Sequence, residues 1–366
     1  MTGVSILIAL SSTLLFLYNS GYIEEWFNKR AFQYLEKQTG LNITYQNSTW
    51  AKALSKGVFY LKNVTVIRPE PVPPQENWCI FELSIDKIRL KISPLWFILG
   101  RGWVKEMKVQ GVRGVVDRRT EWKDPSWKPR NWPIFWGDFH FTNVVVQDCH
   151  FTLYFPEASQ RAVSVFIEVL KCPRIRRRYL LYDVICSTRI DGVFDGCRLA
   201  YRELHPERQN EGREMMLRIY GLGVDLLSKN ASGPLGWMTE GEMDMEVQVM
   251  LPTDVERVNN IHFNFFTRLN RVVLSPSLFD QEIDYISNAI ALPIARYFNA
   301  YKRSIQLSSQ MQLPKEHFDR SWSLADIEFW DAMSEAISDS LTDVYNKNRP
   351  TSIKEWWQYI WKTITA

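Results

Sequence analysis

The feature that most constrains this chain is the run from Gly241 to Leu251, in which apolar and polar residues alternate from Glu242 to Val249. In an extended strand, alternate side chains point to opposite faces, so this segment has one apolar face and one charged or polar face. Similar alternation recurs at residues 151–155, 163–169 and 261–265. The pattern predicts an antiparallel β-sheet whose apolar side must be buried.

Two kinds of cover would bury this apolar side. Helices or a second sheet are the usual cover, but the middle of the chain contains only one or two convincing amphipathic helices. A bound apolar ligand is the other possibility, and the alternation does not distinguish a ligand-binding groove from an ordinary core. The residues concerned are Met243, Met245, Val247, Val249, Leu251, Ile261, Phe263, Phe265, Val163, Val165 and Ile167.

Composition limits the class of protein. Among 366 residues, 46% are hydrophobic and 23% are charged, which is typical of an ordered chain. The formal net charge of +3 is too small for a nucleic-acid-binding surface, so no nucleic acid contact is expected. The five cysteines form no CxxC pair, which favours buried free thiols, although a bridge between Cys186 and Cys197 remains an alternative.

Both ends of the chain carry membrane signals. The first 23 residues contain no charged side chain and are mostly apolar, which predicts a membrane anchor. The C-terminal segment Ile353–Ile364 groups Trp356, Trp357 and Trp361 with lysines, which predicts a helix lying among lipid headgroups. The alternative is that this helix caps the sheet.

The predicted fold is mainly β with flanking α: a long curled antiparallel sheet with an apolar groove, an N-terminal anchor, and amphipathic helices near both ends. Within it, apolar residues change phase near Asp86–Lys87, which predicts a bulge or bend there. Val104–Arg119 is expected to form two short strands around Gly111, and about seven further strands follow to Leu274, with one break at Pro173. The domain prediction is an anchor at 1–23, a membrane-proximal helix and linker at 24–56, a β-rich groove domain at 57–277, a helix plus final strand at 278–325, and C-terminal amphipathic helices at 326–366.

Motifs for catalysis are missing from the sequence. It contains no HExxH, GxSxG, GxxxxGK[ST] or GxGxxG pattern, so we predict neither an enzyme nor a bound metal or cofactor, apart from phospholipid as a ligand. Charged residues at predicted strand ends are interpreted as structural ion pairs that could join one another: Asp117, Arg118, Arg119 and Asp183.

A short basic run is the candidate for headgroup contact. It comprises Arg174, Arg176, Arg177 and Arg178, and cations of this kind bind anionic lipid headgroups. The alternative is an ordinary solvated loop.

Several segments, in order along the chain, resemble the fungal mitochondrial distribution and morphology family of inner-membrane proteins. They are Gly111–Arg119, Gly137–Phe139, Leu180–Asp183, Gly233–Trp237, Asp284–Ile290 and Asp319–Trp322. The resemblance implies an inner-membrane protein with its bulk in the intermembrane space, needed for mitochondrial shape, membrane organisation and inheritance. The segments Thr39–Gly40 and Gly57–Val66, after the apolar start, are more loosely similar to the bacterial AsmA-like group, which implies a curled sheet with a groove for phospholipid tails.

Two functions follow from these observations. In the first, a membrane-anchored module handles or transfers phospholipids, with acyl chains against the apolar face and a protein partner or self-assembly completing the path to a second membrane. In the second, the protein is an inner-membrane scaffold that docks partner proteins without carrying lipid. The scaffold would use the tryptophans of the Pro-rich segment between residues 121 and 136.

Overall fold

The fold is seen in a computed structural model. It describes residues 41–49, 57–69, 79–93, 104–119, 140–154, 162–176, 179–206, 212–225, 238–252, 260–274, 299, 304–319, 321, 324–327 and 329–348.

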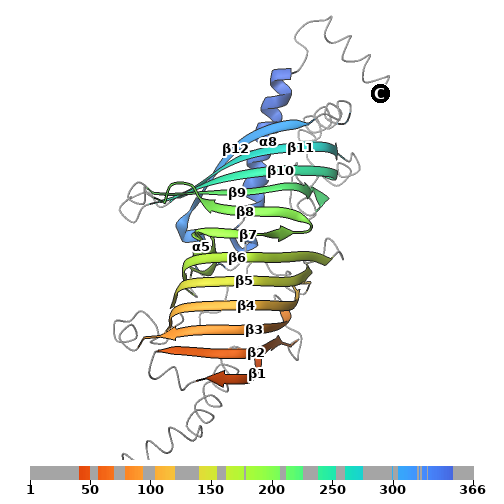
Figure 1. Ribbon diagram of the computed structural model, residues 1–366. Helices are drawn as coiled ribbons and strands as arrows, with labels where there is room; N and C mark the ends of the chain where they lie inside the picture. Colours follow the sequence, from red (N-terminus) through yellow and green to blue (C-terminus); the bar gives the residue numbers. More distant parts are fainter. Residues whose placement is uncertain are drawn as a thin grey trace, which may run out of the picture.

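One open sheet of twelve strands forms the body of the protein, and the strands lie in the sheet in the order in which they occur in the chain (Figure 1). All neighbouring strands are antiparallel except β4 and β5, which are parallel. The strands are β1 (Asn42–Thr49), β2 (Val58–Arg68), β3 (Ile80–Ile92), β4 (Val104–Asp117), β5 (His140–Tyr154), β6 (Ala162–Arg176), β7 (Arg189–Phe194), β8 (Cys197–Glu203), β9 (Arg213–Gly223), β10 (Met238–Leu251), β11 (Asn260–Leu274) and β12 (Ile305–Pro314).

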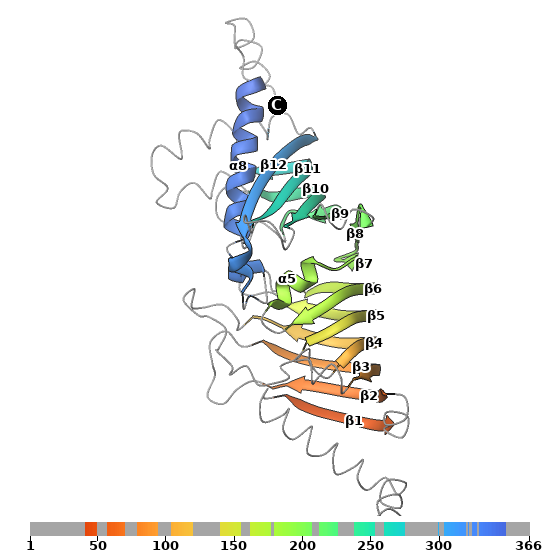
Figure 2. The same cartoon turned by 90° about the vertical axis from the view of Figure 1, so that its left-hand side faces the viewer.

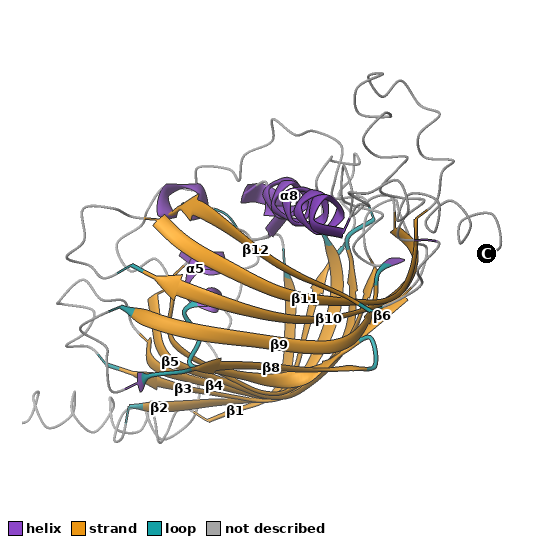
Figure 3. Cartoon of the chain, turned by 90° about the horizontal axis from the view of Figure 1, so that it is seen from above, coloured by secondary structure: helices purple, strands orange, loops and turns teal. Residues whose placement is uncertain are grey.

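The described helices lie on one side of this sheet (Figure 2). The long helix α8 crosses the last strands and packs against β12, whereas the short helix α5 packs on β6. Seen from above, the strands bend along their length around these helices, so the helices occupy the concave side (Figure 3). The helices are α5 (Leu180–Ile185), the 3-10 turns η5 (Lys315–Phe318) and η6 (Leu324–Ile327), and α8 (Phe329–Asn348).

Several strands bend at a single residue in the left-handed backbone region. Asn63, Gly111 and Asp148 have φ between 50° and 71° in the middle of β2, β4 and β5, and Gly221 and Arg271 do the same in β9 and β11. Glycine, asparagine and aspartate are the residues that adopt this conformation most easily, which leaves Arg271 as the strained member of the set. We call these five bends together the crease; those at Asn63, Gly111 and Asp148 share one register across β2 to β5.

The crease changes which alternate residues face the concave side. In β2 the buried residues Leu61 and Val64 flank the bend, and in β9 Ile219 and Leu222 do so. Each strand therefore presents apolar side chains on the concave side both before and after its bend. Of the bulge or bend expected near Asp86–Lys87, the structure shows no bulge, because β3 keeps its register against both β2 and β4 there. Asp86 and Lys87 are instead two consecutive exposed positions beside the bend of β2.

The structure corrects three sequence-based expectations. The segment around Gly111 is one strand, β4, because the left-handed glycine bends the strand without ending it. Strand β6 continues through Pro173, which is tolerated because β7 pairs with β6 only as far as Lys171 and so needs no N–H from the proline. The sheet is mixed rather than wholly antiparallel.

The remaining predictions either agree with the structure or concern residues that it does not describe. Seven strands run from β5 to β11 as expected, and the predicted strand and helix after residue 304 are β12 and α8. The predicted anchor, the membrane-proximal helix, the helix expected at 278–302 and the C-terminal tryptophans lie outside the described residues. Among the helices that are described, none has the length and apolar character needed to cross a bilayer.

Candidate functional site: the concave face of the sheet

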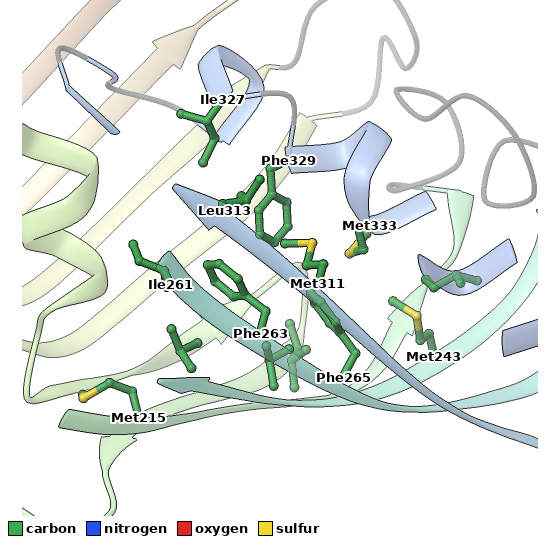
Figure 4. Close-up of a cluster of buried hydrophobic side chains, with 14 of the residues drawn as sticks. Met215, Met243, Ile261, Phe263, Phe265, Met311, Leu313, Ile327, Phe329 and Met333 are labelled. Carbon is green, nitrogen blue, oxygen red and sulfur yellow. The ribbon is translucent and has the colours of Figure 1, made fainter. Parts of the chain in front are cut away.

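The concave face of the C-terminal half, β7 to β12, is a closed core under α8 (Figure 4). The ring of Phe329 on α8 meets the rings of Phe263 and Phe265 at centroid distances of 5.5 and 6.3 Å. Met333 and Ile337, one and two turns later, are also buried. Since these contacts come from the protein itself, no ligand is needed to cover this part of the sheet.

Most of the predicted groove residues lie in this core. The structure shows ordinary core packing for these residues, because α8 covers them. Core packing was the second of the two possibilities that the sequence pattern left open. The predicted groove at these positions is therefore corrected: they belong to the hydrophobic core. They are Met243, Val247, Val249, Leu251, Ile261, Phe263 and Phe265, all buried, and Met245, partly buried against them.

The concave face of the N-terminal half, β1 to β6, differs in its cover. In the described part of the chain, no helix packs extensively on β1 to β5, whose main neighbours are the adjacent strands. A small cluster of Phe59, Leu61 and Val64 is buried, and the apolar side chains around it are only partly buried. These are Ile43, Tyr45, Val66, Ile85, Ile88, Leu90 and Ile92.

Strands β4, β5 and β6 continue this apolar face. Val112 faces Ile85 on one side and Cys149 on the other, and Phe151 faces Val165. The predicted groove residues Val163, Val165 and Ile167 belong here and not to the core under α8. Val163 is fully buried, whereas Val165 and Ile167 retain partial exposure.

The two halves meet at α5, which is fixed to β6 by a buried ion pair. The carboxylate of Asp183 is completely buried, and Arg176 donates to it from its backbone N, Nε and Nη2 at 2.7–3.0 Å. Nε of Arg174 lies 3.5 Å from the same carboxylate, and this side chain is 43% exposed. Because the hydrogen bonds of Arg176 satisfy the acid, Arg174 keeps most of its donors on the surface.

A second buried network supports α5 from β8 and β9. The hydroxyl of Tyr201 donates to the carbonyl of Ile185, and Nη1 of Arg213 donates to the carbonyl of Cys186 at 3.0 Å. Burial raises the pKa of the Cys186 thiol to about 11 and also raises the pKa of Tyr201. The five cysteines are free thiols, in agreement with the favoured interpretation of the sequence.

Of the charged residues predicted at strand ends, Asp117 and Arg119 pair with each other, whereas Asp183 joins neither of them. Asp117 pairs with its neighbour Arg119, whose hydrogen bonds lower the pKa of the Asp117 carboxyl. Asp183 pairs instead with Arg174 and Arg176, which come from the preceding strand. The expected pairing between the two groups is corrected, because each acid finds an arginine close to it in the chain: Arg119 for Asp117, and Arg176 for Asp183.

The remaining predicted site residues are accounted for as follows. Arg118 follows β4, and its backbone N donates to the carbonyl of Tyr154. Arg177, Arg178 and the tryptophans at 356, 357 and 361 lie outside the described residues, as does the Trp-rich segment at 121–136. Within the described ranges, no three His, Cys, Asp or Glu residues come together as metal ligands.

Sequence reasoning did not identify β1 to β5 as the less covered part of the apolar face. The signal was present in β3, where Phe81, Leu83 and Ile85 precede the phase change and Ile88 and Leu90 follow it. In β3 the apolar residues shift from odd to even positions, so residues three apart share a face. The same shift in β2 would have placed Leu61 and Val64 on one face, and in β4 it would have placed Val109 and Val112 on one face.

These features define a class of protein: an open, bent β-sheet with an apolar concave face that, among the described elements, a helix covers over the second half. The family model for yeast mitochondrial distribution and morphology (MDM) proteins matches residues 69–275 and 256–361. The chain therefore belongs to this family of mitochondrial proteins, and the resemblance inferred from the sequence is confirmed.

Individual relatives agree. The chain is 31% identical over 311 residues to mitochondrial distribution and morphology protein 31 of Schizosaccharomyces pombe, covering 75% of this chain and 51% of the relative. It is 23% identical over 397 residues to protein 31 of Saccharomyces cerevisiae, covering 91% of this chain and 68% of the relative. Protein 32 of Vanderwaltozyma polyspora is 25% identical over 73% of this chain and 43% of its own length. The chain thus spans about half the length of the first of these relatives.

Proposed function

We propose that this protein handles or transfers phospholipids at the mitochondrial inner membrane, with its bulk in the intermembrane space, and that it supports mitochondrial organisation, morphology and inheritance in this way. Acyl chains lie against the concave face of β1 to β6, and the polar convex face meets water. The names of the relatives support the part of the proposal that concerns mitochondrial distribution and morphology.

One observation carries the lipid part of the proposal. Both halves of the sheet present the same apolar concave face, but α8 covers only the second half among the described elements. Each methylene that leaves water contributes about 0.8 kcal/mol, so an acyl chain supplies to the first half the burial that α8 supplies to the second. The crease favours acyl-chain binding because it places apolar side chains on the concave side at both ends of each bent strand.

Arg174 suggests where a headgroup lies. It is half-exposed at the end of β6, beside the partly buried concave face, with its Nε 3.5 Å from Asp183. A half-exposed guanidinium at the border of an apolar surface is suited to a phosphate. We expect Arg174→Gln to lower the anionic share of bound lipid and to leave the total nearly unchanged, as measured by headgroup-resolved mass spectrometry.

The test of the proposal is lipid co-purification of the full chain from mild detergent, followed by extraction and mass spectrometry. Strand β4 offers a matched pair of variants, because Val112 faces the concave side and Val115, 41% exposed, faces the convex side. We expect Val112→Asp combined with Val165→Asp to reduce bound phospholipid at least about ten-fold, since a buried carboxylate is incompatible with hydrocarbon.

The control variant, Val115→Asp, is expected to bind lipid as the unmodified chain does. Circular dichroism should show the same β content in all three proteins. Equal lipid content in the concave and convex variants, with both proteins folded, would reject the concave face as the binding surface.

A further inference from the structure

The convex face of the sheet carries a row of cations that neither the core nor the concave face explains. Directly opposed residues on successive strands define it: Arg89 faces Lys108, Lys171 faces Arg189, and Arg189 faces Arg202. Val145 of β5 links Lys108 to Lys171 in the same register. We call Arg89, Lys108, Lys171, Arg189 and Arg202 the basic row; it crosses six strands, about 24 Å at the usual strand spacing.

Acids accompany the row but lie beneath it. Glu106 pairs with both Arg89 and Lys108, and Asp191 pairs with both Arg189 and Arg202. The two acids are 23% and 11% exposed, whereas the side chains of Lys108 and Arg202 are 47% exposed. Each acid is thus shared by two more exposed cations, and the surface that a partner meets is positive.

The row has definite ends. Continued in register over β9, β10 and β11, the next residues are Met216, Gln248 and Asn264, all uncharged. On β10 the charged residues of this face are acidic, and Arg218 and Arg271 already pair with Glu246 and Glu242. In this register the cations therefore run from β3, where Arg89 faces the uncharged Tyr60 of β2, to β8.

Like charges directly opposite one another on neighbouring strands destabilise a sheet, by up to about 1 kcal/mol for each pair. The row contains three such pairs, and at Lys171 no described acid shares the charge in an ion pair. An anionic partner relieves this repulsion. The shape of the basic row indicates the kind of partner. The row is a line on an outwardly curved surface, so it fits a broad anionic surface whose charges can rearrange beneath it. A small anion would need an enclosing site instead.

We propose that the basic row docks the convex face of β3 to β8 on an anionic phospholipid bilayer surface. This contact involves headgroups only and is independent of the proposed acyl-chain binding on the opposite face. Either can fail while the other stands, because the two faces share no side chains.

The experiment measures lysine accessibility in the full chain mixed with vesicles of phosphatidylcholine alone, or with about one third phosphatidylglycerol. An amine-reactive reagent is applied, and the modification rates of Lys108 and Lys171 are read by mass spectrometry. Lys315, on η5 at the concave side, is the internal reference. We expect both lysines to be protected about five-fold or more on anionic vesicles, and the protection to disappear at about 0.5 M salt.

A variant pair measures the same contact through affinity. Lys108→Gln with Lys171→Gln is expected to weaken the preference for anionic over neutral vesicles about 25-fold, at about five-fold for each cation lost. The matched control removes two exposed cations of the acidic region on the same face, Arg268→Gln with Arg271→Gln, and should leave the preference unchanged. Comparing the two vesicle types in every case cancels any insertion that does not depend on lipid charge.

Three results would overturn the proposal. Equal protection on neutral vesicles would show that charge does not drive the contact, and no protection on either vesicle would show that the face does not dock. Protection by soluble polyglutamate or by an oligonucleotide, but not by anionic vesicles, would assign the row to a different polyanion.

Discussion

At the scale of single residues, Asp183 holds α5 in place where the two halves of the concave face meet. Its completely buried carboxylate depends on the three hydrogen bonds from Arg176. We expect Asp183→Asn to lower the free energy of unfolding by about 3–5 kcal/mol, because it leaves a partly buried guanidinium without its counter-charge. Urea denaturation followed by circular dichroism measures this loss.

The matched control is Asp148→Asn. Nη2 of Arg113 donates to both carboxylate oxygens of Asp148, but both side chains are nearly half exposed, and such pairs contribute less than about 1 kcal/mol. Asparagine also accepts the left-handed backbone at this position. Losses of equal size in the two variants would contradict the structural role given to Asp183.

Cys186 predicts a specific pH dependence. Its folded pKa is about 11 against 9.0 for an ordinary thiol, so the folded state retains its proton more strongly than the unfolded state does. The resulting stability is complete below pH 9 and is lost as the pH rises towards 11, by about 3 kcal/mol in total. Denaturation curves between pH 8 and 11 should show this loss in the unmodified chain but not in Cys186→Ala.

Tyrosines and other groups titrate in both of these proteins, so the difference between the two curves isolates the thiol. Tyr201, whose pKa is also raised by burial, contributes to both curves in the same direction. Parallel curves for the two proteins would show that Cys186 is less buried than the structure places it.

At the scale of elements, the crease depends on residues that tolerate the left-handed backbone. Gly111 has φ +71°, and a Cβ there would lie 2.0 Å from a carboxylate oxygen of Asp86. Gly196 has φ +82° with open space around it, so Gly196→Ala meets only the backbone cost. We expect Gly111→Ala to be less stable than Gly196→Ala by about 1–3 kcal/mol, measured by thermal or urea unfolding, since it adds a steric clash to the same strain. Equal stabilities would show that Asp86 does not close the space beside Gly111.

The elements also show what sequence reasoning reaches and where it stops. Strands β10 and β12 and helix α8 have uninterrupted periodicity, so their positions were predicted. Helix α5 has only six residues and shows too little periodicity to be recognised. The parallel pairing of β4 with β5 depends on the route of the connection between them, which the pattern of neither strand records.

The candidate site was predicted only in part for a related reason. In β10 the alternation is unbroken from Met243 to Val249, which drew attention to the half of the sheet that α8 covers. In β2 and β4 the phase changes at Asn63 and Gly111, so neither strand shows a long alternating run. A pattern identifies an apolar face, but the helix that covers it is a property of the three-dimensional fold.

At the scale of the whole molecule, twelve strands at the usual spacing make a sheet of about 50 Å, of which α8 closes one end. This length is comparable to one bilayer with its headgroups, so a path between two membranes requires a partner or self-assembly. The concave face of β1 to β6 and the basic row on the convex face lie on opposite sides of the same sheet. The sheet can therefore contact a membrane surface and hold acyl chains without a conflict between the two roles.

The most direct test of acyl-chain binding is photo-crosslinking at single positions of the full chain in membranes that contain radiolabelled phospholipid. A benzoylphenylalanine replaces Phe151 on the concave face of β5, or Phe266 on the convex face of β11, where the native ring is 49% exposed. The account predicts labelled phospholipid attached at position 151 and little at position 266. Equal labelling at both positions, or labelling at 266 alone, would contradict the binding of acyl chains on the concave face.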